Sequence, residues 1–181
     1  MNNTHRKHFS VLPGILLIFL ILLLTAFLFA TRGKAKQTVP DEVPDEPTGL
    51  VVDIADVFTP DEEQMLTQVI RHFEKTTSGQ LRVLVVQTTG SIPIDEYGFT
   101  IANRWKIGHK DRNDGVLFTL AIRDHANRID VGIGWEDVLT NARCSEVLKS
   151  IVPELRAEKY AEASAKVVHS LEHYLTEPDE R

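Results

Sequence analysis

Cysteine is almost missing from this chain, and basic residues are scarce over most of its length. Cys144 is the only cysteine among 181 residues, so no disulfide can form within the chain. All 26 acidic residues lie after position 37, together with 15 of the 20 Lys and Arg residues, which gives this part a net charge of minus 11. Nucleic acid is therefore not an expected partner, because a phosphate backbone requires clustered Lys and Arg.

Charged residues are missing from positions 11–30, which read "VLPGILLIFLILLLTAFLFA". At 1.5 Å per residue this run spans about 30 Å, the thickness of the hydrocarbon core of a bilayer. A cleaved signal peptide has a shorter apolar region and ends in a small-x-small site, but Leu28 stands two positions before Ala30. The run predicts an uncleaved transmembrane helix over 11–30, after a short tail at 1–10, in a single-pass protein of the inner (cytoplasmic) membrane.

A charged, Pro-rich linker is predicted at 31–49. Its stretch "TVPDEVPDEPTG" alternates prolines with pairs of acids, and both features favour an extended, semi-rigid spacer. The orientation rule counts Lys and Arg near the ends of a membrane helix. Two basic residues precede the helix and three follow it: Arg6 and Lys7, and then Arg32, Lys34 and Lys36. That count alone slightly favours the orientation in which the following domain stays inside.

Apolar periodicity over 50–175 predicts an α/β domain with a small mixed β-sheet sandwiched between helices, followed by an acidic tail at 176–181. Thr59, Pro60 and Glu62 form a capping box with proline at the first helical position, so a helix begins there. Positions 81–88 and 115–122 are apolar on both faces, as in strands covered by helices on two sides. The strand–helix–strand unit between them predicts a right-handed parallel crossover.

Two further elements complete the predicted fold. A helix over 95–105 places Phe99, Ile101, Ala102 and Trp105 largely on one side. A strand over 128–134 alternates three apolar residues inward: Ile129, Val131 and Ile133. The short connection "DHAN" before that strand predicts an antiparallel hairpin, and the chain is then expected to be helical to position 175, with a restart at Pro153.

Acidic residues gather around this predicted hairpin. The end of its second strand, with Glu136 and Asp137, should lie beside the start of its first, with Asp111, Asn113 and Asp114. Crowded carboxylates repel one another unless a cation or an arginine neutralises them. The residues alone favour a turn whose acids pair with Arg104 or Arg112, and leave a site for a hard cation as the alternative.

Two further motifs match known functional patterns, but both are given structural interpretations. "HSLEH" at 169–173 matches the H-x-x-E-H pattern of a zinc protease helix, but few residues follow it to supply a further ligand. We expect His169 and His173 on the solvated face of the last helix. "GIG" at 132–134 begins a dinucleotide fingerprint without completing it, so it is interpreted as a strand end with a close backbone approach. Cys144 is expected to be a buried structural residue, and no G-x-S-x-G motif supports a serine esterase.

Two segments of the chain carry a family resemblance: "VVDIADVFT", followed by a helix, and "RWKIGHKDRNDGVLFTLAIRDHANRIDVGIGWEDVLTNA". They resemble the TPM domain family of bacterial envelope and thylakoid-lumen proteins. The resemblance implies an α/β sandwich over about 50–175. Some members of the family bind calcium or another divalent ion, some are described as acid phosphatases, and others are accessory factors of membrane complexes. Asn141 departs from the pattern, because many members have Asp there.

The resemblance also implies that Asp53, Asp114 and Glu136 belong to a functional cleft. Oxygen ligands without paired Cys or His favour a hard cation, so a weak Ca²⁺ site is predicted from Asp53, Asp111, Asp114 and Glu136. The expected function is that of a membrane-anchored, extracytoplasmic accessory or interaction module whose partner is another membrane protein. The alternative is a metal-dependent acid phosphatase.

Overall fold

A four-stranded sheet forms the middle layer of the domain. The computed structural model describes residues 43–177. Its strands are β1 (Val51–Asp53), β2 (Gln80–Val86), β3 (Gly115–Ala121) and β4 (Ala126–Val131), in the order β1-β2-β3-β4. β2 runs parallel to β1 and β3, and β4 is antiparallel to β3. The predicted mixed sheet, parallel crossover and hairpin are therefore confirmed.

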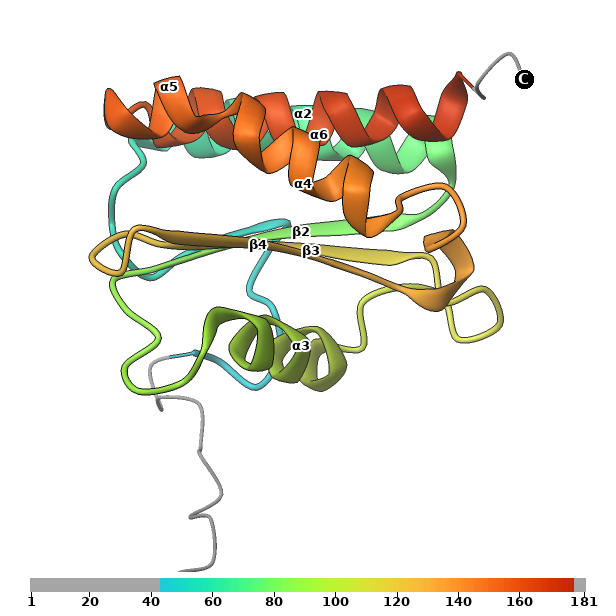
Figure 1. Cartoon of the computed structure of the whole chain (residues 1–181), viewed down its shortest axis with the longest axis horizontal. Helices are drawn as coiled ribbons and strands as arrows, with labels where there is room; N and C mark the ends of the chain where they lie inside the picture. Colours follow the sequence, from blue (N-terminus) through green and yellow to red (C-terminus); the bar gives the residue numbers. More distant parts are fainter. Residues whose placement is uncertain (1–42, 178–181) are drawn as a thin grey trace, which may run out of the picture. The chain divides into compact units, whose positions relative to one another are not determined.

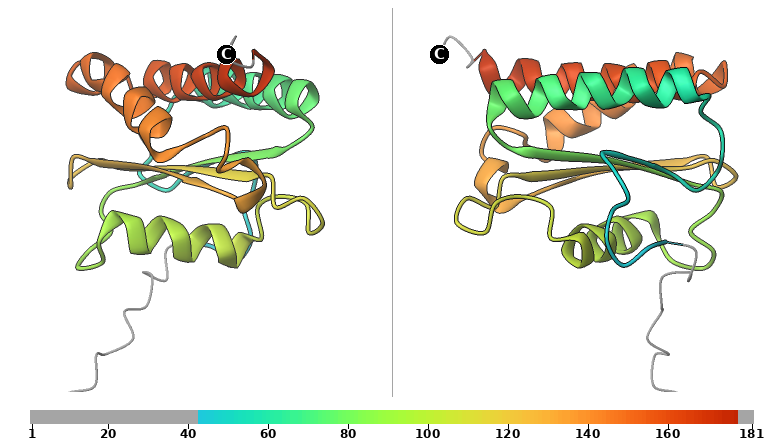
Figure 2. Two further views of the ribbon diagram at one scale, coloured as in Figure 1. Left: turned by 45° about the vertical axis from the view of Figure 1, so that its right-hand side comes forward. Right: turned by 180° about the vertical axis from the view of Figure 1, so that it is seen from behind.

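Helices cover both faces of this sheet, as Figures 1 and 2 show. On one face lie α2 (Pro60–Thr77), α4 (Asn141–Ser150), α5 (Val152–Arg156) and α6 (Tyr160–Thr176). On the other lies α3 (Ile94–Trp105). Two apolar cores result, because β2 and β3 are buried on both faces and contribute side chains to each.

The predicted start of α2 is confirmed in detail. The Thr59 hydroxyl accepts a hydrogen bond from the Glu62 backbone N–H, and the Glu62 carboxylate accepts one from the Thr59 N–H at 2.8 Å. Pro60 opens the helix, where its missing N–H costs nothing. Leu66, Ile70 and Phe73 then face the sheet, fully buried.

Two apolar residues lie where the helix and strand patterns did not place them. Phe99 is 64% exposed, because α3 faces the sheet through Tyr97, Gly98 and Ile101 instead. Ile133 is 77% exposed, because β4 ends at Val131 and the chain turns into a short 3-10 helix at Ile133–Trp135. The predicted inward position of Ile133 was therefore wrong, and Phe99 does not share the buried side of α3 with Ile101 and Trp105.

The predicted membrane helix at 11–30, the tail at 1–10 and most of the linker lie outside the described residues. Within residues 43–177, no helix is both long and apolar enough to cross a bilayer. The described end of the linker differs from a free spacer, because Val43 is buried in the core beneath α3. The Trp105 indole N–H also donates to the Pro44 carbonyl at 2.8 Å. The folded domain thus begins before position 50.

Candidate functional site

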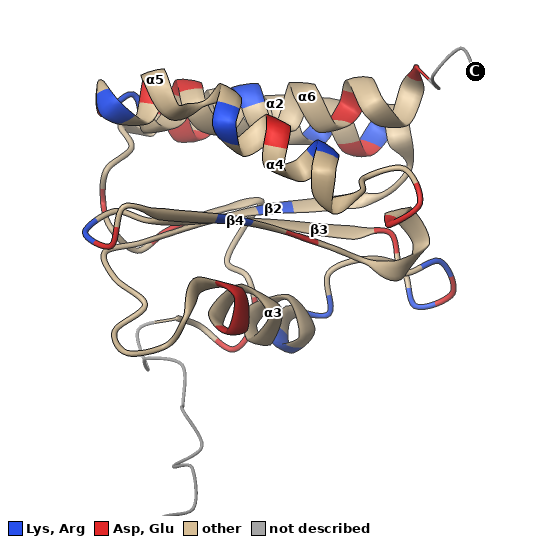
Figure 3. Cartoon of the chain, in the orientation of Figure 1, with Lys and Arg blue, Asp and Glu red and all other residues tan. Residues whose placement is uncertain are grey.

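The "DRNDG" segment between α3 and β3 is a turn. The His109 carbonyl accepts hydrogen bonds from the backbone N–H groups of Arg112 and Asn113, at 3.0 and 2.7 Å. Asn113 takes a left-handed conformation, with φ at 50°, which asparagine tolerates better than most residues. Asp111 lies exposed on this loop. Figure 3 shows both signs of charge on it, and acidic positions in the turn that follows β4.

Asp114 is buried at the end of this turn and is fully engaged by its neighbours. Its Oδ1 accepts from the His109 backbone N–H at 2.7 Å and lies 3.0 Å from the His109 ring Nδ1. Its Oδ2 accepts from Arg112 Nε at 2.7 Å. Burial alone raises the pKa of this carboxyl, but the hydrogen bonds from His109 and Arg112 outweigh it and lower the pKa to about 2. The turn with an ion pair is thus the arrangement found at Asp114.

The glycines of "GIG" allow two backbone segments to touch. The N–H of Gly134 donates to the Asn113 carbonyl at 3.0 Å, and that of Gly132 donates to the Gly115 carbonyl at 2.8 Å. A Cβ atom at Gly132 would overlap the Asn113 carbonyl, and one at Gly134 would overlap the carbonyl of Arg112. The interpretation as a strand end with a close backbone approach is confirmed.

The four predicted calcium ligands do not come together. Asp53 pairs with Val85 near the end of β2, whereas Gly115, which follows Asp114, pairs with Gln80 at its start. Five residues of strand separate these two positions on β2, so Asp53 lies roughly 17 Å along the sheet from Asp114. There it accepts hydrogen bonds from the backbone N–H groups of Val57 and Phe58, both at 2.8 Å. Among residues 43–177, no group of three or more His, Cys, Asp or Glu side chains is placed to hold a metal. These residues do not fit the predicted calcium ion.

Arg104, one predicted neutralising group, lies away from this acidic region. Its NH1 lies 3.4 Å from the Val43 carbonyl and 3.9 Å from Asp45. Arg112 performs the neutralisation instead, and it also donates to the Ser78 carbonyl at 2.6 Å.

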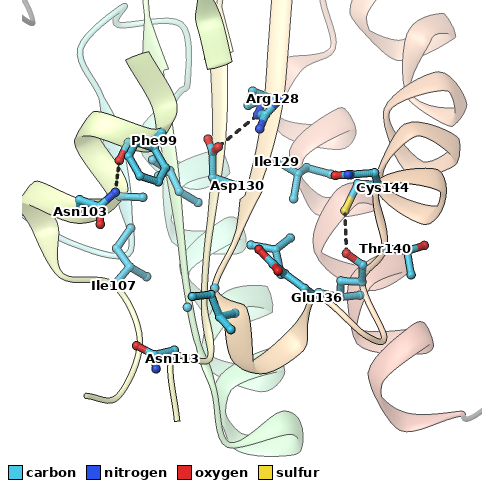
Figure 4. Close-up of a pocket in the computed structure, with 18 of the residues that line it drawn as sticks. Phe99, Asn103, Ile107, Asn113, Arg128, Ile129, Asp130, Glu136, Thr140 and Cys144 are labelled. Atoms are coloured by element: carbon cyan, nitrogen blue, oxygen red, sulfur yellow. Dashed lines mark hydrogen bonds and ion pairs between the residues drawn. The ribbon is translucent and has the colours of Figure 1, made fainter. Parts of the chain in front are cut away.

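A cleft of about 630 Å³ follows the free edge of β4 (Figure 4). α3 forms one wall with Phe99 and Asn103, and Ile107 follows just after it. The start of α4 forms the other wall with residues such as Thr140 and Cys144. The loop residue Asn113 and the acids Glu136 and Asp137 close one end. The hairpin therefore does bring Asn113, Glu136 and Asp137 to one site, whereas Asp114 turns away from it.

Asp130 contributes a buried carboxylate to this cleft. Its Oδ1 accepts from Arg128 Nε at 3.1 Å, and its Oδ2 is buried without a hydrogen-bond partner among the described residues. Burial raises the pKa of this carboxyl, the ion pair with Arg128 opposes the rise, and the charge of Asp95 adds to it. Gly98 of α3 makes room for the carboxylate, because a Cβ atom there would overlap Asp130 Oδ2.

Cys144 and the histidines of "HSLEH" take structural positions. The Cys144 thiol is buried, donates weakly to the Leu139 carbonyl at 3.6 Å, and has its pKa raised by burial, so little of it is thiolate at neutral pH. The side chains of His169 and His173 are 60% and 61% exposed on α6. Glu172 lies 3.3 Å from His72 Nε2 on α2 and 3.9 Å from His169 Nδ1. Both expectations are confirmed.

Phe99 and Asp130 are the site residues that sequence reasoning missed. Gly98 was the available signal, because a glycine inside an apolar helix costs stability and usually has a packing reason. The partner of Gly98 is Asp130, on the strand that packs against this helix. The sequence does not say which strand the helix covers, so this partner could not be identified from it.

Replacing Asp114 should test the buried ion pair. Asp114→Asn should lower the free energy of unfolding by about 2 kcal/mol at pH 7, since a pKa lowered from 3.8 to about 2 contributes stability on that scale. This contribution is complete above the unfolded pKa and is lost as pH falls through the folded pKa. Denaturant unfolding should therefore show the gap closing between about pH 4 and pH 2. Asp111→Asn on the same loop is the matched control, with a change below about 0.5 kcal/mol; a gap independent of pH contradicts the assignment.

A double-mutant cycle should test the fit between Gly98 and Asp130. Gly→Ala inside a helix normally stabilises by about 0.5–1 kcal/mol, but Gly98→Ala should destabilise by about 1–3 kcal/mol because the methyl group overlaps the carboxylate. Adding Asp130→Ala should recover most of that loss, measured by thermal or denaturant unfolding. Additive effects of the two substitutions would show that they do not touch.

Three solved structures share the fold of this chain. The N-terminal domain of a protein from P. gingivalis superposes with a TM-score of 0.68 at 23% identity, over 77% of this chain and 92% of that chain. The N-terminal domain of cg2496 from Corynebacterium glutamicum gives 0.59 at 12% identity, over 80% and 93%. BA42 from the psychrophilic bacterium Bizionia argentinensis gives 0.59 at 22% identity, over 65% and 81%. At these identities the likeness shows the shared fold.

The family is shown by sequence. A search of curated proteins found no match. The family model described as the TPM domain, in contrast, matches residues 51–174, which include all four strands and the cleft at β4. The chain therefore belongs to the TPM domain family.

Proposed function

We propose that this chain is a membrane-anchored, extracytoplasmic TPM-domain protein that acts as an accessory module by binding a partner protein in the β4 cleft. The observation that carries this proposal is the exposure of Phe99 and Ile133 beside that cleft. Large apolar side chains exposed in a polar rim are typical of protein interaction sites, and aromatic residues there contribute much of the binding energy.

The distribution of such side chains supports the cleft over other surfaces. Among the described residues, the exposed large apolar side chains are Met65, Phe99 and Ile133. Met65 lies on α2 and stands apart from the other two, which both line the β4 cleft. A partner that covers this cleft would remove both from water at once.

The membrane location of the module rests on the sequence. The uncharged run at 11–30 is long enough to span a bilayer. Long domains that follow such a helix translocate largely regardless of nearby charge, and the resemblance to envelope proteins favours the outer side. A tether restricts the domain to the membrane surface, so its partner is expected to be another membrane protein. No metal is part of this proposal, because the described carboxylates do not fit one.

Site-specific photo-crosslinking in intact cells tests the proposal. A photoreactive phenylalanine analogue at Phe99 should crosslink the full-length chain, in the membrane fraction, to a discrete protein. The same analogue at Met65, the exposed apolar position on α2, is the matched control and should give no such band. Equal crosslinking at the two positions, or none at either, would contradict a partner in the β4 cleft.

A metal-dependent acid phosphatase is the second candidate, and one observation favours it. The His109 ring is oriented by the buried Asp114, with Arg112 NH2 2.8 Å from its Nδ1. A phosphoryl-transfer site needs such a cation and an oriented proton carrier. However, Arg112 is already engaged by Asp114 and by the Ser78 carbonyl, so it is not free to bind a phosphate.

We therefore expect little or no turnover of an aryl phosphate by the full chain in mild detergent. The assay compares the wild type with His109→Gln and Glu136→Gln, from acidic to neutral pH, with calcium, magnesium or a chelator. Glu63→Gln on α2 serves as a control for loss of one exposed carboxylate. Turnover that is abolished in both site variants and by chelation, but kept in the control, would replace the accessory module by the phosphatase.

A further inference from the structure

β4 is a free edge whose backbone groups point into the cleft. The strand order leaves β1 and β4 at the edges, and β1 has three residues where β4 has six. The Gly132 N–H bonds to the Gly115 carbonyl. Because bonded residues alternate in an antiparallel pair, Arg128 and Asp130 face β3 with their backbone groups. Asn127, Ile129 and Val131 consequently direct theirs away from β3, along the floor of the cleft.

The walls of the cleft match the shape of one additional strand. α3 and the start of α4 rise on either side of β4, so its edge is recessed between them (Figure 4). Six residues of strand extend roughly 20 Å. A single extended segment of similar length lies along such an edge without meeting the helices, whereas a second folded domain brings its own helices against them.

The charge of the cleft selects a basic segment. Its lining carries three acids, Asp130, Glu136 and Asp137, against one cation, Arg128. Arg128 is already paired with Asp130, and neither Glu136 nor Asp137 forms an ion pair with any residue in 43–177. Asp130 Oδ2 is buried and has no hydrogen-bond donor among the described residues. Residues directly opposite each other on paired strands have Cβ atoms about 5 Å apart, which brings a Lys or Arg on the incoming strand close to Asp130.

We propose that the partner adds an extended, basic segment to β4 as a fifth strand. The Asn127, Ile129 and Val131 backbones bond to it, and its basic side chains face Asp130 and the Glu136–Asp137 end. The aliphatic parts of these basic side chains cover Phe99, because Phe99 and Asp130 lie on the same face of the sheet. Its apolar side chains point to the other face, toward Ile129 and Cys144. This mode of recognition takes its affinity from main-chain hydrogen bonds and its specificity from alternate side chains. The inference rests on the proposed partner-binding function and specifies the chemistry of the partner.

Hydrogen exchange, read by NMR on the full chain in detergent, tests the proposal with defined peptides. The probe is Ac-Lys-Val-Lys-Ile-Lys-Val-NH2. Two matched peptides are Ac-Lys-Val-Lys-Pro-Lys-Val-NH2, which keeps the charge but loses a pairing N–H, and Ac-Glu-Val-Glu-Ile-Glu-Val-NH2. The first peptide should slow exchange of the Asn127, Ile129 and Val131 amides by at least about tenfold, and the other two should not, because strand pairing requires the N–H and the cleft is acidic.

Variants of the chain separate the cleft from general attraction to an acidic protein. Glu136→Gln with Asp137→Asn should weaken binding of the first peptide by about tenfold, whereas Asp61→Asn with Glu63→Gln on α2, an equal loss of charge, should leave it nearly unchanged. Equal binding of the proline peptide, or binding without protection of the three amides, overturns the proposal.

Two other outcomes also decide the matter. If the three amides are already protected without peptide and sedimentation shows a dimer, a second copy of the chain occupies β4 and the basic-segment proposal is wrong. If the Phe99 crosslink to a partner is found but the first peptide gives no protection, the partner-binding function stands and strand addition fails.

Discussion

The hydrogen bonds around the buried Asp114 hold together one whole end of the domain. Its side chain fixes His109 and Arg112 in the loop after α3, and Arg112 extends the connection to the Ser78 carbonyl after α2. The backbone carbonyl of Asp114 accepts from the Gln80 N–H at 3.1 Å, while the Gln80 side chain accepts from the Gly108 N–H at 2.8 Å. The neighbouring Asn113 carbonyl receives Gly134. Without this carboxylate, the loop that closes the β4 cleft would lose its support.

Local signals in the sequence were sufficient for most of the fold. The capping box at Thr59, the strands that are apolar on both faces and the short hairpin connection each depend on residues close in sequence, and each is found in the structure. The predicted side of Phe99 on its helix and the predicted inward position of Ile133 were wrong, because they depend on the exact orientation of α3 and the exact end of β4. A shift of one residue moves a side chain to the other face of a strand.

Two of the predicted calcium ligands, Asp53 and Asp114, lie apart for a topological reason that the predicted fold already contained. Parallel strands start at one end of the sheet and finish at the other, so the end of β1 with Asp53 lies opposite the start of β3 with Asp114. Shared charge suggested a shared site, but the direction of the strands separates the two residues. Glu136, in contrast, was placed correctly beside Asn113, because an antiparallel hairpin returns the chain to its starting end.

The buried charge of Asp130 also bears on aggregation. An edge strand with unpaired backbone groups invites any exposed strand to join it, and proteins protect such edges with charged residues that point inward. Asp130 lies on β4 with one oxygen bonded to Arg128 and the other without a partner. An apolar strand that joined this edge would bury Asp130 Oδ2 more deeply without giving it a hydrogen-bond donor. Burying an unpaired polar group costs free energy, so this association is disfavoured. The same carboxylate that lowers the stability of the isolated domain thus protects crowded copies of it from indiscriminate sheet extension.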